Sequence, residues 1–263
     1  MKITVLSGGV GGARFLRGLL AVVPPADVTI IGNVADDLEI LGLRVSPDLD
    51  SVLYALAGLS DEERGWGRAD ETWNALATVS ELSGDAWFKL GDRDIGLHLV
   101  RTQMLEAGYP LSAVTEALCR RWQPGVRLLP MSDDRVETHI AVADPDSPSG
   151  RRVVHFQEYW VRMHAAVPAE AVLVVGQEEA TPAPGVLEAI TDADLVMLPP
   201  SNPVVSVGTI LGVPGVRDAL RATAAPVVGL SPIVGGDHVR GMAAQVLASI
   251  GVEVSAAAVG AHF

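Results

Sequence analysis

Apolar residues at the start of the chain follow first the pattern of a buried strand and then that of a helix. Residues 2–6 are almost continuously apolar, which is typical of a strand covered on both faces. Apolar residues then recur at helical spacing from Phe15 until Pro24-Pro25 ends the pattern, and residues 28–31 form a second apolar run. This β-α-β order predicts a parallel sheet with a right-handed crossover.

The same rhythm returns after residue 170, where each predicted strand is followed by a helical pattern. These later strands are predicted at residues 171–175, 194–198 and 226–230, and we expect all three to be buried. The middle of the chain differs, because residues 48–124 are mainly helical in pattern. Short strands are predicted after it, at residues 126–130, 136–142 and 153–159.

These patterns predict an α/β fold with a doubly wound, Rossmann-like parallel sheet. We expect a single domain over residues 1–263. Its core would be formed by about 1–50 and 165–263, and a mainly helical, partly β insertion over about 51–164 would form one side of a cleft.

Composition excludes several classes of protein. Apolar residues make up 49% of the chain, yet no apolar run reaches the roughly 18 residues of a membrane span. We therefore expect a cytoplasmic protein without a membrane partner. The net charge of −13 argues against nucleic acid, and it means that a phosphorylated substrate needs a metal or a local positive site. With Cys119 as the single cysteine, neither a disulfide framework nor a thiolate zinc site can form.

A glycine-rich loop follows the first strand directly, as Ser7-Gly8-Gly9-Val10-Gly11-Gly12-Ala13-Arg14. Glycines let main-chain N–H groups approach phosphate oxygens, and a helix N-terminus adds a favourable dipole. We predict that Gly8, Gly9, Gly11, Gly12 and Arg14 bind substrate. The alternative is a tight turn without a ligand. A dinucleotide fingerprint would need glycine at position 14, and the Gly-Lys-Ser/Thr of a Walker A loop is absent.

Two acidic turns come soon after this loop, at residues 33–37 and 46–51. Carboxylates alone would repel phosphate, so a hard cation between them is favoured, and Mg²⁺ suits carboxylate and phosphate oxygens. Asp36, Asp37 and Asp50 are the candidate carboxylates, with an amide oxygen of Asn33 nearby. Of these, we predict Asn33, Asp37 and Asp50 as metal ligands, with Asp37 and Asp50 in catalytic roles. The alternative is that these carboxylates only cap helices.

Other polar residues occur at places where ligands commonly bind. Trp66 stands between two glycines and would be either a stacking platform or a packed core residue. Lys89 is one of only two lysines, so a compact ammonium group is indicated there, although a solvated charged loop is the alternative. Further substrate-binding candidates are found after Lys89 and after two of the later strands: Asp92, Asp94, His98, Ser201, Asn202 and Ser231.

Several segments, taken in order, resemble the 2-phospho-L-lactate transferase family of coenzyme F-420 biosynthesis, including its actinobacterial phosphoenolpyruvyl transferase branch. The resemblance covers nearly the whole chain. The segments that carry it are Leu6–Gly12, Asp48–Ser51, Gly65–Gly67, Asp70–Trp73, Phe88–Asp94, His98 with Arg101-Thr102, Ser132–Asp134, Phe156–Trp160, Pro200–Val204 and Ser231–Gly236.

The resemblance implies a reaction. A guanosine-diphospho-linked donor would transfer 2-phospholactate or phosphoenolpyruvate to a ribityl hydroxyl of the deazaflavin Fo, with release of GMP. It implies that Asp50 and Lys89 contact the deazaflavin, and that Asp37 and Asp50, with Asn33 behind them, hold Mg²⁺. It also implies that the loops at Ser201-Asn202 and Ser231 line the nucleotide side, and that the protein is a homodimer.

Two other hypotheses remain at this stage. A non-catalytic, nucleotide-sugar-binding regulator would share the core of the family but not the Trp66 loop and the 89–94 segment. A nicotinamide dehydrogenase is disfavoured because Arg14 stands where the third glycine of the fingerprint is required.

Overall fold

A five-stranded parallel sheet forms the centre of the computed structural model, which describes residues 1–239 and 241–263. The strand order is β10-β9-β1-β2-β5. The bounds of these strands are β1 (Ile3–Ser7), β2 (Val28–Gly32), β5 (Arg127–Pro130), β9 (Leu195–Leu198) and β10 (Val227–Gly229). All five residues of β1 are buried, as the continuous apolar run predicts, because helices cover both faces of the sheet.

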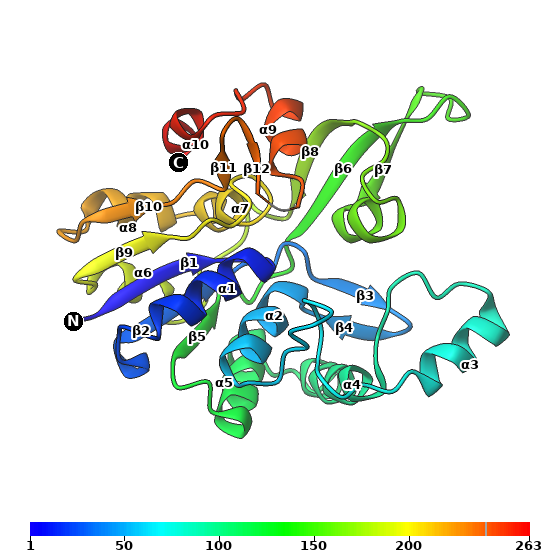
Figure 1. Ribbon diagram of the computed structural model, residues 1–263, viewed down its shortest axis with the longest axis horizontal. Helices are drawn as coiled ribbons and strands as arrows, with labels where there is room; N and C mark the ends of the chain where they lie inside the picture. Colours follow the sequence, from blue (N-terminus) through cyan, green and yellow to red (C-terminus); the bar gives the residue numbers. More distant parts are fainter. Residues whose placement is uncertain (240) are drawn as a thin grey trace.

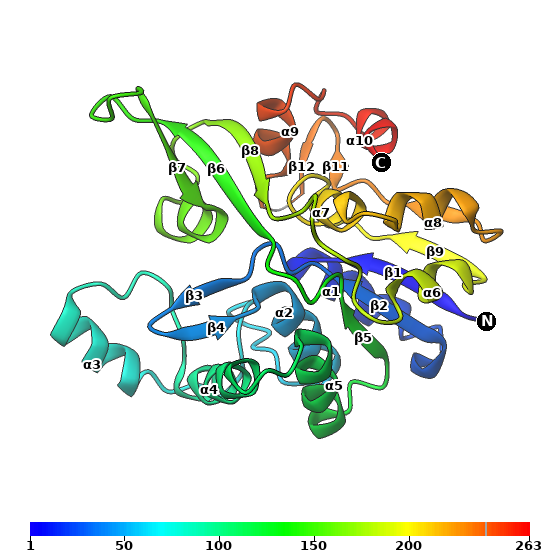
Figure 2. The same cartoon turned by 180° about the vertical axis from the view of Figure 1, so that it is seen from behind.

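Helices flank this sheet on both sides, which confirms the predicted α/β class. In Figure 1, α1 crosses the near face, and after a half-turn of the molecule α6 and α8 lie on the near face in Figure 2. The helices around the sheet are α1 (Gly9–Leu19), α2 (Pro47–Leu56), α5 (Leu111–Trp122), α6 (Val186–Thr191), α7 (Val207–Gly212) and α8 (Val216–Ala222), with the short turn η1 (Pro25–Asp27) before β2.

A second, antiparallel sheet of order β7-β6-β8 stands beside the central one (Figure 1). Its strands are β6 (Glu137–Ala143), β7 (Arg151–His155) and β8 (Ala169–Val175). The strand predicted over 153–159 ends early, because a helical turn, η2 (Glu158–Arg162), follows β7. Tyr159 of this turn is fully buried in a separate apolar cluster with Ile140 and Val142.

Two strand assignments from the sequence are therefore corrected. The strand at 127–130, expected in the insertion, pairs in parallel with β2 at the edge of the central sheet. The strand at 169–175, expected in the core, instead pairs antiparallel with β6. The expected burial is also wrong for β10, whose three residues are all exposed, and for β8, none of whose residues is buried. Apolar runs reveal strands but not their partners, because pairing depends on residues far away in the chain.

The remaining elements extend the structure on either side. A hairpin that the sequence pattern did not reveal, β3 (Leu38–Ile40) and β4 (Leu43–Val45), lies near α3 (Asn74–Ser83) and α4 (Asp92–Glu106). The C-terminal part contains β11 (Ile233–Val234), β12 (Asp237–His238), α9 (Ala243–Ser249) and α10 (Ala256–His262). In the part of the chain that the structure describes, none of the helices combines the length and apolarity needed to cross a bilayer.

The turn from β1 into α1 is crowded by neighbouring loops. A Cβ atom at Gly8 would lie 2.5 Å from Asp48 Oδ2 and 2.7 Å from the Cβ of Ser206. Gly9 has φ +63°, a left-handed conformation that favours glycine. These glycines are therefore required by the close approach of the protein's own chain, whether or not a ligand binds.

We expect Gly8→Ala to lower the free energy of unfolding by roughly 1–3 kcal/mol, the usual cost of overpacking a well-filled site. Gly18→Ala is the matched control, because nothing lies within 4 Å of its Cβ position near the end of α1. This control should gain up to about 1 kcal/mol from its better helix propensity. Urea unfolding of both variants checks the contrast, and equal stability would contradict the crowding argument.

Candidate active site

Three loops meet at the carboxyl ends of the parallel strands, where doubly wound sheets bind their ligands. The glycine loop after β1 is joined to the loop after β9 by Ser201, whose Oγ donates to Gly8 O (2.8 Å) and accepts from Gly8 N (3.3 Å). The loop after β2 joins them through Asn33. The structure therefore brings the predicted residues Gly8, Ser201 and Asn33 together.

Asn33 braces this junction with every polar atom of its side chain. Its Nδ2 donates to Asp48 Oδ2 (2.9 Å) and to the main-chain oxygen of Val205 (3.2 Å). Its Oδ1 accepts from Ala35 N (2.9 Å) and from Thr209 Oγ1 (2.8 Å). The predicted metal contact of Asn33 would require its amide oxygen to give up one of these bonds.

Asp48 lies against the start of α1, in the position expected for an anion at a helix N-terminus. Burial raises the pKa of this carboxyl to about 6, although hydrogen bonds from Asn33 and from the main chain of Gly9 partly offset the effect. A phosphate cradled by the glycine loop would therefore lie beside this carboxylate. The predicted phosphate contacts at Gly8, Gly9, Gly11 and Gly12 stay a prediction.

Asp36 and Asp37 each carry a buried carboxylate oxygen, Oδ1, without a hydrogen-bond partner. The other oxygen of Asp37 accepts from Ser46 Oγ (2.6 Å). Burial raises the pKa of both carboxyls well above the usual value, and the charge of Asp48 raises that of Asp36 further. Unpartnered carboxylate oxygens in a group of like charges fit a hard cation such as Mg²⁺.

The antiparallel sheet holds this acidic turn from the other side. Thr138 N donates to Ala35 O (2.6 Å), and His155 Nε2 is 3.2 Å from the main-chain oxygen of Asp37. Within residues 1–239 and 241–263, no three His, Cys, Asp or Glu side chains form a ready-made metal site. Mg²⁺ commonly binds through only one or two carboxylates together with water and substrate phosphates.

Asp50 is paired with Arg101 in a buried bidentate ion pair. Arg101 Nη1 donates to Asp50 Oδ2 (2.9 Å), and Nη2 donates to Asp50 Oδ1. His98 Nδ1 lies 3.0 Å from Arg101 Nη1. Burial lowers the pKa of His98 to about 4, so the neutral ring accepts a hydrogen bond from Arg101 there. The predicted metal role of Asp50 would require its oxygens to be shared with the guanidinium group.

Behind this pair, Tyr54 and Asp94 form a second buried contact, with Tyr54 Oη donating to Asp94 Oδ1 (2.7 Å). Burial raises the pKa of Asp94 to about 6, while the Tyr54 hydrogen bond lowers it. Glu71 accepts from the main-chain N–H groups of Arg93 (2.8 Å) and Asp94 (2.9 Å), which anchors the start of α4. Asp94 is therefore held in place from both its main chain and its side chain.

Trp66 and Lys89, predicted separately, line one cavity of about 530 Å³. The other lining residues are Arg64, Trp73, Leu76, Ala77, Ser80 and Ala86. The Arg64 guanidinium carbon lies 4.6 Å from the ring centre of Trp66 and 5.0 Å from that of Trp73. Trp66 is 38% exposed, so the stacking-platform interpretation fits better than core packing.

The other predicted substrate residues lie at several places around these loops. Asp92 accepts from Thr72 Oγ1 (2.6 Å) and Ala75 N (3.0 Å), so it anchors the start of α3. Asn202 Oδ1 accepts from the main chain of the residue two positions later (3.0 Å), and Ser231 Oγ accepts in the same way (3.0 Å). All three side chains thus have local structural roles, and their contact with substrate stays a prediction.

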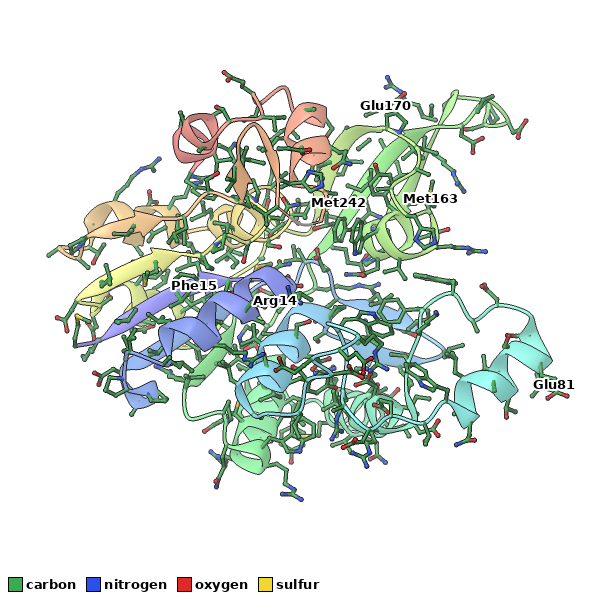
Figure 3. The ribbon with its side chains drawn as sticks, in the orientation of Figure 1. Arg14, Phe15, Glu81, Met163, Glu170 and Met242 are labelled. Carbon is green, nitrogen blue, oxygen red and sulfur yellow. The ribbon has the colours of Figure 1, made fainter. Side chains whose placement is uncertain are left out.

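Arg14 is exposed on α1, close to the middle of the molecule (Figure 3). It lines a smaller cavity of about 60 Å³ together with Ser51 and Trp66. Because Trp66 borders both cavities, this small space beside α2 adjoins the larger one that contains Lys89.

The sequence interpretation missed Arg101, Tyr54 and Asp48 as site residues. Two signals pointed to Arg101: its i, i+3 spacing from His98, which puts both on one face of α4, and its place in a segment that carries the family resemblance. Asp48 lies in the acidic turn at residues 46–51, but its contact with the glycine loop depends on tertiary packing, which the sequence does not show.

We expect Asp94 to make stability depend on pH. The native state keeps the Asp94 proton up to about pH 6, whereas the unfolded chain releases it near 3.8. The native state therefore binds more protons in this window, and the free energy of unfolding falls as pH rises through it, by on the order of 2 kcal/mol. Asp94→Asn should remove this contribution, while that of Asp48, whose pKa is raised to about the same value, remains.

Urea unfolding of the wild type and Asp94→Asn between pH 4 and 7 measures the effect. Tyr54→Phe removes the hydrogen bond that favours the charged Asp94 carboxylate, which raises the pKa of Asp94 further. In this variant the fall in the free energy of unfolding should therefore continue to higher pH. If wild type and Asp94→Asn show parallel pH curves, the argument is wrong.

With this geometry established, comparison with known proteins identifies the relatives. Residues 3–261 match the family described as "2-phospho-L-lactate transferase CofD". A protein of Kitasatospora aureofaciens named phosphoenolpyruvate transferase is 64% identical over 265 residues, covering 100% of this chain and 82% of that protein. A Streptomyces coelicolor protein of the same name is 62% identical over 264 residues, with the same coverage.

Solved structures agree at the level of the fold. The crystal structure of protein BH3568 of Bacillus halodurans superimposes with a TM-score of 0.61 at 21% identity. The match covers 95% of this chain and 75% of that one. Since the family match extends over almost every residue, the chain belongs to the CofD family of 2-phospho-L-lactate transferases, which are transferases of coenzyme F-420 biosynthesis.

Proposed function

We propose that this protein transfers phosphoenolpyruvate from a guanosine-diphospho-linked donor to a ribityl hydroxyl of the deazaflavin Fo. The products would be dehydro coenzyme F-420-0 and GMP. Membership of the CofD family supports a transferase role in this biosynthesis. The Kitasatospora and Streptomyces relatives carry the name phosphoenolpyruvate transferase, which favours this acid over 2-phospho-L-lactate.

The observation that carries the proposal is a group of buried, mutually repelling carboxylates, of which two keep an unpartnered oxygen and a third lies at the start of α1. Asp36 Oδ1 and Asp37 Oδ1 lack partners, and Asp48 lies against Gly8 and Gly9. Such a site repels a diphosphate unless a cation is added. With a cation it binds one, because the cation and the main-chain N–H groups of the helix N-terminus both favour phosphate oxygens.

In the transfer, the ribityl oxygen of Fo forms a bond to the phosphorus of the phosphoenolpyruvyl group. The bond between this phosphorus and the bridging oxygen of the diphosphate breaks, GMP leaves, and the hydroxyl proton passes to water. Displacement at phosphorus depends on positioning and on charge neutralisation more than on a nucleophilic side chain. No covalent intermediate with the protein is needed.

Named residues would supply these functions. Asp37 and Asp36, with their unpartnered oxygens, fit Mg²⁺, and Asp50 would join them by sharing its carboxylate with Arg101. Bound Mg²⁺ would neutralise charge that develops on the diphosphate. Arg101 fixes the Asp50 carboxylate through the bidentate ion pair, so that this carboxylate would be positioned to orient the acceptor hydroxyl. Trp66 and Lys89 would bind the deazaflavin ring.

The deciding experiment incubates the purified protein with Fo, Mg²⁺ and each candidate donor, and determines the mass of the product. We expect transfer from the phosphoenolpyruvyl donor, release of GMP, and loss of activity with EDTA that Mg²⁺ restores. Nucleotide binding without transfer from either donor would support the non-catalytic regulator instead.

Asp37→Asn should raise the Mg²⁺ concentration needed for half-maximal transfer by about 10-fold or more, because one charged oxygen ligand is lost. Asp134→Asn is the control, since the Asp134 carboxylate accepts hydrogen bonds from the main-chain N–H and the hydroxyl of Thr181 (both 2.7 Å) and is distant in the sequence from the acidic turns. Mg²⁺ titrations of the initial rate measure both variants. If Asp37→Asn needed the same Mg²⁺ concentration as wild type for half-maximal transfer, Asp37 would not be a metal ligand.

Trp66→Ala should raise the KM for Fo by about 10-fold and leave the KM for the donor nearly unchanged, given that one stacking contact is worth roughly 1–3 kcal/mol. Trp160→Ala is a matched control, because Trp160 is 39% exposed, against 38% for Trp66, and is not among the residues that line the cavity. If Trp66→Ala raised the KM for the donor more than the KM for Fo, Trp66 would be assigned to the nucleotide side of the site.

A further inference from the structure

We propose that the cavity lined by Arg64, Trp66, Trp73 and Lys89 binds the aromatic ring of the acceptor as an anion, with the ring hydroxyl deprotonated. This inference rests on the proposed function, which assigns the cavity to the deazaflavin. It goes further by naming the ionisation state that the cavity selects and the residues that select it.

The charge of the cavity is opposite to that of the whole chain. The protein has a net charge of −13, yet the eight residues that line this cavity include two cations and no carboxylate. The remaining lining groups are two indoles, three small aliphatic side chains and the Ser80 hydroxyl. Such a surface favours a flat, apolar ligand that carries negative charge.

Arg64 provides a fixed part of this surface. Its Nε donates to the main-chain oxygen of Trp66 (3.1 Å), and its Nη2 donates to the main-chain oxygen of Arg68 (2.6 Å). The guanidinium group is therefore held beside both indole rings, which pack edge to face with their centres 6.2 Å apart. Asp61 lies 3.4 Å from Arg64 Nη2, so part of the Arg64 charge is already compensated.

Lys89 supplies the charge that is not compensated. Within residues 1–239 and 241–263, no carboxylate is within ion-pair distance of its ammonium group. The side chain is exposed, and it follows Trp87 and Phe88, whose rings pack edge to face with centres 5.5 Å apart. An exposed ammonium group that lines the cavity is able to reach an acidic group of a ligand there.

The ligand chemistry matches this arrangement. The deazaflavin ring of Fo carries an aromatic hydroxyl, an acid of the phenol class. A cation close to such a group favours its charged form, whereas a purely apolar cavity would favour the neutral one. On binding, the O–H bond breaks, the proton passes to solvent and the electron pair stays on the ring oxygen, so no further reactant is needed.

The test is a spectrophotometric titration of the ring hydroxyl in the complex, because the phenol and the phenolate absorb differently. Fo is saturated with wild-type protein at a series of pH values and compared with free Fo. We expect the acid dissociation constant of the hydroxyl to be about 10-fold larger in the complex. Lys89→Met should bring it back close to the value of free Fo, while Lys89→Arg should keep most of the increase.

Lys2→Met is the matched control, since Lys2 is the only other lysine and lies at the start of β1, where its ammonium group is 3.8 Å from Asp192. A second measurement avoids reliance on one variant: Fo with its ring hydroxyl methylated should bind wild type about 10-fold more weakly than Fo. This difference should disappear in Lys89→Met.

The outcomes separate the two proposals. If Fo binds but its acid dissociation constant is unchanged or smaller, the anion-binding inference is overturned and the proposed function stands. If Fo fails to bind at all, both are overturned. An increase that persists in Lys89→Met would also contradict the assignment, because the charge would then come from elsewhere.

Discussion

Burial of several carboxylates at the ends of the parallel strands is the constraint on which the rest of the site depends. Asp36, Asp48 and Asp50 are each at most 6% exposed. Among these three, the structure pairs Asp50 with a guanidinium group, that of Arg101. Charged groups are unfavourable in a protein interior unless they are paired, so the carboxyls of the other two have raised pKa values. Protonation of Asp36 and Asp48, or a cation beside them, would relieve this unfavourable burial of negative charge.

The glycine loop packs directly against one of these buried carboxylates, that of Asp48. Its close contacts with Asp48, Ser206 and Ser201 explain why glycine is needed at position 8 even before a ligand is considered. The same packing puts the Asp48 carboxylate at the N-terminus of α1, which is the place where a phosphate would bind. Nucleotide binding and neutralisation of Asp48 are therefore coupled in any mechanism that uses this loop, because two negative groups would share one N-terminus.

The other side of the site is built on helix starts rather than strand ends. Glu71 anchors the first turn of α4, and Asp92 anchors that of α3. These contacts tie together the segments that carry Trp73 and Lys89, on the two sides of a cavity whose charge differs from that of the chain as a whole. In the proposed reaction, the donor side of the molecule would depend on buried acids, whereas the acceptor side would depend on indoles and cations. This division explains how one acidic protein is able to bind two dissimilar substrates.

The sequence by itself determined the α/β class, the opening β-α-β unit and the residue types of the site, because buried parallel strands and glycine loops are local patterns. It also indicated Asp50 through an acidic turn, Lys89 through the rarity of lysine in the chain, and Trp66 through its two flanking glycines. Tertiary structure alone decided that β5 joins the central sheet, that Arg101 neutralises Asp50 from 51 positions away, and that Trp66 and Lys89 share a cavity. Local patterns carry no record of which distant segment will pack against them. Charge compensation and cavity shape arise only when segments that are far apart in the chain are buried together.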